Sequence, residues 1–247
     1  MELDRPSEPD ILLGVSAKGW IALAGGFAGA LFVSLIPFLQ YIFSFFSILV
    51  HEMGHALAGW LFGYPSIPSF DFYYGGGVTL HQSRFLFLNG VVFLLFAVLG
   101  YMVRRSRVML ALVAAAAGVY AMLAITFWHE VLIIGLGHGT ELIIAGIFIY
   151  RAASGSSILQ SAERPVYAFI GFLVVIQNIV FNYSLVTSNS FRFEYEYAKG
   201  GMEMDYSRLA YEYMHTSLAN VAALFLILAI ATPFVSLGVN LVMRVRQ

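Results

Sequence analysis

The sequence predicts an all-α polytopic membrane protein with about six to seven transmembrane helices and one small β-hairpin. Of the 247 residues, 60% are hydrophobic and only 11% are charged, whereas a soluble domain usually carries about 25% charged residues. The mean hydropathy is +0.82. Apolar segments long enough to cross a bilayer recur between short polar breaks. Most of the chain therefore faces lipid or other apolar helices.

Seven apolar segments reach the length of ~20 residues that a transmembrane helix needs. They cover approximately residues 20–39, 41–62, 85–103, 108–128, 131–150, 166–185 and 218–242. The polar stretches between them are too short to bury a core of their own. We therefore expect a single integral membrane domain over residues 1–247.

The stretch from Asp71 to Leu80 has a different pattern. Aromatic and β-branched residues flank three consecutive glycines, Gly75 to Gly77, and such a pattern predicts a strand or a small hairpin. At membrane depth, backbone outside a helix needs protein or water to satisfy its polar groups. Packing at the mouth of the helix bundle and exposure as a surface turn both remain open for this segment.

Charge restricts the partners and the orientation. The net charge of -1 gives no reason to expect a nucleic-acid partner, and the expected partner from composition is the lipid bilayer. The loops on one side of the predicted membrane topology contain slightly more basic residues than the loops on the other side. The more basic side carries Arg104, Arg105, Arg107, Arg151, Arg164, Arg244 and Arg246. Because positive loops stay inside, we predict that residues 104–107 and the C-terminus are cytoplasmic.

The second apolar segment contains an HExxH motif, His51-Glu52-Met53-Gly54-His55. On a helix, residues four apart project from one face, so His51 and His55 are spaced to bind one zinc ion. Glu52 is placed to take a proton from zinc-bound water and pass it to a leaving amine. The alternative is that the three are polar residues satisfied in a bundle core. Ionisable residues inside a membrane are costly and usually mark function, which favours the metal site.

A catalytic zinc site normally has a third protein ligand. The chain has no cysteine, so this ligand must be His, Asp or Glu. His138 lies well inside a predicted span at a depth similar to that of the motif, and Glu141 follows on the same helix face. We predict His138 as the third ligand, with Glu141 as the alternative ligand or as support for one; an interhelical hydrogen bond is the plain alternative for His138. Asp71 and His129 come next as candidates.

The motif on a membrane helix, followed by the glycine-rich hairpin, resembles the site-2 protease family of intramembrane metalloproteases, peptidase family M50. The resemblance covers roughly residues 49–80. It implies a zinc cofactor on His51 and His55, with Glu52 as the general base. It also implies hydrolysis of peptide bonds in membrane-embedded substrates.

One family feature is missing. The family takes its third ligand from an aspartate in a later helix, within a Leu-Asp-Gly motif, and no later predicted span here contains an aspartate. Two other functions remain open: a membrane zinc hydrolase that cleaves a lipid amide or ester, and a non-catalytic metal-binding scaffold or transporter. Intact Glu52 favours an enzyme, because a structural site has no need of a general base.

Overall fold

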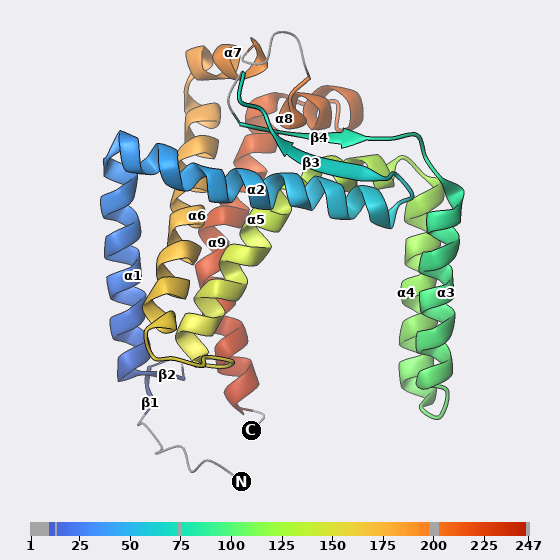
Figure 1. Cartoon of the computed structure of the whole chain (residues 1–247), viewed down its shortest axis with the longest axis horizontal. Coiled ribbons are helices and arrows are strands. Elements are labelled where there is room, and N and C mark those ends of the chain that lie inside the picture. The colour runs from blue at the N-terminus through green and yellow to red at the C-terminus, as the bar shows by residue number, and fades with distance from the viewer. Residues whose placement is uncertain (1–9, 13, 74–75, 198–202, 246–247) are drawn as a thin grey trace. The chain divides into compact units, whose positions relative to one another are not determined.

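A computed structural model describes residues 10–12, 14–73, 76–197 and 203–245 (Figure 1). Its helices are α1 (Ala17–Leu35), α2 (Pro37–Leu61), α3 (Leu86–Met102), α4 (Arg107–Ile125), α5 (Trp128–Ser154), α6 (Glu163–Thr187), α7 (Asn189–Tyr197), α8 (Asp205–Arg208) and α9 (Leu218–Val245). A π-helix, η1 (Leu209–Tyr213), continues α8. Two antiparallel strand pairs complete the fold: β1 (Asp10–Leu12) with β2 (Val15–Ser16), and β3 (Ser66–Phe70) with β4 (Gly77–His81).

The predicted fold class is confirmed. Six helices in the described part of the chain are long and apolar enough to cross a membrane: α1, α2, α4, α5, α6 and α9. The segment predicted at 85–103 forms α3, which has 17 residues and is the shorter apolar helix of the set. The glycines near residue 137 do not break α5, which runs unbroken from Trp128 to Ser154. The protein is therefore an integral, multi-pass membrane protein.

The chain divides into two compact units. The first comprises residues 1–47, 141–197 and 216–247, and the second comprises residues 48–140 and 198–215. In the first unit, α1 and α6 lie side by side (Figure 1). A Cβ atom on Gly26 of α1 would clash with Ala168 of α6, and a Cβ atom on Gly171 of α6 would clash with Ala145 of α5. Small residues thus bring these helices into close contact, as is common in membranes.

In the second unit, the end of α2 is held by a tight cap. Gly63 has φ +93°, and the Tyr64 N–H reaches the Gly59 carbonyl at 2.8 Å; this pairing is a Schellman motif. The Tyr120 hydroxyl from α4 donates to the Leu61 carbonyl at 2.9 Å. These bonds satisfy carbonyls that would otherwise be left without partners at a helix end, and they turn the chain sharply into β3.

Strands β3 and β4 form the predicted hairpin, with Ser66 paired to His81 and Phe70 to Gly77. Because side chains alternate between the two faces of a strand, Gly77, Thr79 and His81 share one face of β4. That face contacts α2, as described below. Tyr74 and Gly75 of the predicted glycine turn lie outside the described residues. So does Arg246, one of the basic residues on the predicted cytoplasmic side.

Candidate metal centre and its general base

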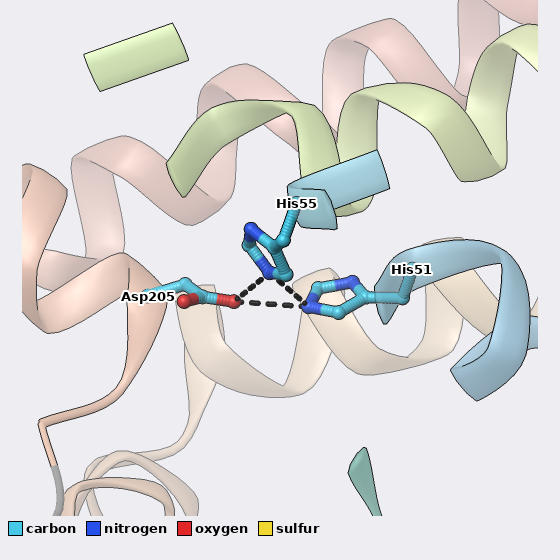
Figure 2. A group of neighbouring side chains, drawn as sticks. All are labelled: His51, His55 and Asp205. Carbon is cyan, nitrogen blue, oxygen red and sulfur yellow. Dashed lines mark hydrogen bonds and ion pairs between the residues drawn. The ribbon is translucent and has the colours of Figure 1, made fainter. Parts of the chain in front are cut away.

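Helix α2 presents His51 and His55 to a common point (Figure 2). Their Nε2 atoms are 2.9 Å apart, as the spacing of four residues on one helix face predicts. His55 is buried, and its Nδ1 lies 2.7 Å from the Ile133 carbonyl oxygen. A carbonyl only accepts, so Nδ1 carries the proton. In the neutral ring, Nε2 therefore presents a lone pair to the site.

Asp205, the first residue of α8, completes the group (Figure 2). Its Oδ2 lies 2.9 Å from His51 Nε2 and 3.1 Å from His55 Nε2. Burial raises the pKa of Asp205, but the hydrogen bonds and charges that the two histidines supply when protonated outweigh burial and hold that pKa well below its usual value. The carboxylate is therefore ionised at neutral pH.

These three side chains suit a metal ion. A carboxylate oxygen and the lone pair of His55 Nε2 face each other at 3.1 Å, and such a pair repels unless a proton or a cation lies between them. The circle through the three donor atoms has a radius of about 1.7 Å, which is below the zinc–ligand length of about 2.0 to 2.2 Å. One ion therefore reaches all three atoms at once. All three donor atoms lie within 4.8 Å of one another.

Gly137 of α5 leaves space for this group. A Cβ atom placed there would lie 2.5 Å from His55 Nε2 and 2.7 Å from His51 Cε1. Any side chain at residue 137 would therefore displace the histidines or occupy the position of the ion. By contrast, a Cβ atom on Gly135, two residues earlier and on the other side of α5, would meet nothing within 4 Å.

The segment that carries Asp205 is anchored on both sides of the aspartate. Tyr206 is completely buried, and Leu209 and Ala210 are buried as well. At the far end of η1, the Tyr213 hydroxyl donates to Glu130 at 2.6 Å. Burial, followed by the hydrogen bond and charge of Glu130, raises the pKa of Tyr213 to about 12. The phenol is therefore neutral and able to donate over the whole physiological range.

Glu52 is buried next to the histidines in sequence and is held by the hairpin. The Thr79 hydroxyl lies 2.6 Å from Glu52 Oε2 and 3.0 Å from the Glu52 carbonyl oxygen. A Cβ atom on Gly77 would overlap the Glu52 carboxylate, so β4 approaches this side chain closely. A cavity of about 40 Å³ lies beside it, lined by Glu52, Leu49 and residues 68–70 of β3. The carboxylate thus borders a small space rather than a closed core.

His138, the third ligand predicted from the sequence, lies against the metal group. Its ring contacts the ring of His51, with centroids 4.4 Å apart, and the ring of Tyr206, with centroids 4.6 Å apart. The Asp205 carboxylate is a second candidate for the third ligand, and it lies within 3.1 Å of the Nε2 atoms of both motif histidines. The buried Glu141 belongs to the other compact unit, where its carboxylate accepts a hydrogen bond from Asn178.

The two remaining candidates have structural contacts. Asp71 Oδ1 accepts the backbone N–H of Tyr73 at 3.0 Å, which caps the turn after β3. His129 is buried; its Nδ1 donates to the Thr126 carbonyl, and its Nε2 lies 3.0 Å from the Tyr64 hydroxyl. These bonds join the start of α5 to the segment after α2, so His129 is part of the packing there.

Sequence reasoning did not consider Asp205 as a ligand. The third ligand was expected first at the membrane depth of the motif, and Asp205 lies in the acidic segment between the sixth and seventh predicted spans. One signal was available: Asp205 is the only aspartate that follows Asp71 in the chain. Comparison of the chain with protein-family models, curated proteins and solved structures gave no match.

Proposed function

We propose that this chain is an intramembrane zinc metallopeptidase, similar to the site-2 protease family, which hydrolyses peptide bonds of membrane-embedded substrates. The observation that carries the proposal is the convergence of His51, His55 and Asp205 on one point. Two imidazoles and one carboxylate, with a fourth position for water, are a ligand set of catalytic zinc sites. A structural zinc site more often has four protein ligands and no general base.

The residues divide the chemistry between them. His51, His55 and Asp205 would hold the ion, and the single carboxylate offsets half of its charge. When bound, zinc polarises the substrate carbonyl and makes water acidic enough to attack near neutral pH. Glu52 then accepts a proton and delivers it to the leaving nitrogen. Thr79 holds the Glu52 carboxylate through its hydrogen bond, which keeps the base in one rotamer while the proton moves.

The ion can be tested before any substrate is known. The full chain, purified in detergent, should contain about one zinc per chain by elemental analysis. His55→Ala should lose this zinc, because His55 is buried and supplies one of the three donors. Glu52→Gln should keep it, because both imidazoles and Asp205 are untouched. The proposal would be contradicted by a wild-type protein that takes up neither zinc nor any other divalent metal.

Hydrolysis is tested with a mixture of apolar helical peptides in detergent, with new termini detected by mass spectrometry. Glu52→Gln is the control and should lower the rate by about 10² to 10⁴, which is typical for loss of a general base. A parallel panel of lipid amides and esters tests the alternative hydrolase. Cleavage of lipids but not of peptides would indicate the alternative, a hydrolase of lipid amides or esters. Zinc binding without any cleavage that depends on Glu52 would favour the non-catalytic scaffold or transporter.

A further inference from the structure

His81 lies beside the same stretch of α2 that carries the metal site. It is the last residue of β4, and it shares a strand face with Thr79, which holds Glu52. A Cβ atom on Gly59 of α2 would lie 3.0 Å from His81 Nδ1 and 3.1 Å from its Cε1. The imidazole therefore rests on α2 where Gly59 leaves room for it.

Helix geometry relates this position to the metal site. At about 100° per residue, Glu52, His55 and Gly59 fall within a sector of about 60° on α2. Along the axis, His55 lies between the turn of Glu52 and the turn of Gly59. Strand β4 thus places Thr79 at one end of the site, against Glu52, and His81 at the other end, one turn beyond His55.

The hydrogen bonds of His81 determine its tautomer. Ser66, its cross-strand partner, has one hydroxyl proton and donates it to the Tyr64 carbonyl at 2.7 Å. His81 Nδ1 lies 2.7 Å from the same hydroxyl oxygen, so Nδ1 must be the donor in that second bond. The neutral ring then has a lone pair on Nε2. That atom has no hydrogen-bond partner within the described part of the chain.

The surroundings of His81 favour the neutral ring. Burial and the charges of His55 and Arg208 lower the pKa of His81, and only the charge of Asp205 opposes them. The side chain is nevertheless exposed. It does not belong to the candidate metal group formed by His51, His55 and Asp205. A fixed acceptor beside the metal site, open to solvent, is available to a substrate.

We propose that His81 binds the substrate by accepting a hydrogen bond from a backbone N–H at its Nε2. This inference rests on the proposed function and deepens it, because it names what the site recognises. A peptide offers N–H groups on both sides of the scissile bond, whereas a simple ester offers none. The acceptor on His81 therefore favours polypeptide substrates over lipid esters. It would also fix the position of the substrate peptide relative to the ion.

The experiment measures how N-methylation of a probe affects its binding. The probe is a tetrapeptide hydroxamate with apolar side chains, which ligates zinc, and each of its backbone N–H groups is methylated in turn. Dissociation constants are measured for the zinc-loaded full chain in detergent. In the wild type, one methylated position should bind about 3- to 12-fold more weakly, which corresponds to one lost hydrogen bond. In His81→Phe that penalty should vanish, because the acceptor is gone.

Three further variants make the result specific. His81→Gln keeps an acceptor of similar reach and should retain part of the penalty. Ser66→Ala leaves the imidazole but removes its anchor, so it should reduce the penalty even if His81→Phe does not fold. Leu80→Ala, on the opposite and exposed face of β4, should keep the full penalty. Zinc content should equal that of the wild type in all four variants.

The outcomes separate the two proposals. A full penalty in both His81→Phe and Ser66→Ala would overturn the role of His81 and leave the peptidase in place. The same holds if the wild type binds every methylated probe as tightly as the parent. If the zinc-loaded wild type does not bind the parent hydroxamate at all, the peptidase proposal fails, and the role of His81 fails with it.

Discussion

Removal of the Asp205 carboxylate is the sharpest test of the metal centre. Asp205→Ala takes away one of three donors and leaves His51 and His55 in place. The Asp205 Oδ2 atom lies within 3.1 Å of both Nε2 atoms, so it would supply a third donor to an ion held by the two imidazoles. Loss of a group that merely orients a ligand costs about 10- to 100-fold in metal affinity. Loss of a ligand itself should therefore exceed 100-fold, or about 2.8 kcal/mol at 1.4 kcal/mol for each factor of ten.

The comparison with His138→Ala decides between the two candidate third ligands. His138 packs on His51 and Tyr206, so its removal should loosen a ligand and cost about 10- to 100-fold. Zinc affinity is measured by competition with a chelator of known affinity, on protein whose folding is checked by size-exclusion elution in detergent. Glu203→Ala is the matched control, since Glu203 is an acidic residue two positions away with a largely exposed side chain; it should leave the affinity unchanged.

The expected order of zinc loss is Asp205→Ala first, His138→Ala second and Glu203→Ala last. If Asp205→Ala keeps wild-type affinity while His138→Ala loses zinc, the third ligand is His138, as the sequence alone predicts. Equal losses in Asp205→Ala and Glu203→Ala would show that the acidic segment acts through its overall charge and not through a bond to the ion.

Three further predictions concern the support of the site. Thr79→Val should keep zinc but lower the rate of peptide cleavage about tenfold, because Glu52 loses its hydrogen bond; an unchanged rate would mean that this bond does not hold the base. Gly137→Ala should weaken zinc binding about 10- to 100-fold, whereas Gly135→Ala, which meets no atom within 4 Å, should not. Tyr213→Phe should lower the thermal unfolding midpoint of the protein. Because the phenol is protonated in the folded state up to a pKa of about 12, this difference should be full below about pH 10 and disappear between about pH 10 and 12. A difference that persists above pH 12 would contradict the role of the hydroxyl proton.

Several features of this protein are local and could be read from the sequence. Apolar length predicts membrane helices because a bilayer fixes the number of residues that must cross it, and α6 and α9 begin within three residues of the predicted positions. The spacing of four residues places His51 and His55 on one face of any helix. Aromatic and β-branched residues around a glycine turn predict a hairpin, and β3 pairs with β4; β3 lies at Ser66–Phe70, before the predicted segment Asp71 to Leu80.

The partners of these residues were decided by the tertiary structure. Asp205 is 150 residues from His55 in the chain, and it reaches the site through a four-residue helix that no hydropathy pattern marks. In the sequence, Thr79 and His81 have no feature that distinguishes them from other strand residues. In the structure β4 packs along α2, where Thr79 contacts Glu52 and His81 lies over Gly59. Periodicity describes which residues of one element share a face. The face that one element turns toward another depends on close packing between distant segments, and that packing brings Asp205, Thr79 and His81 to the motif.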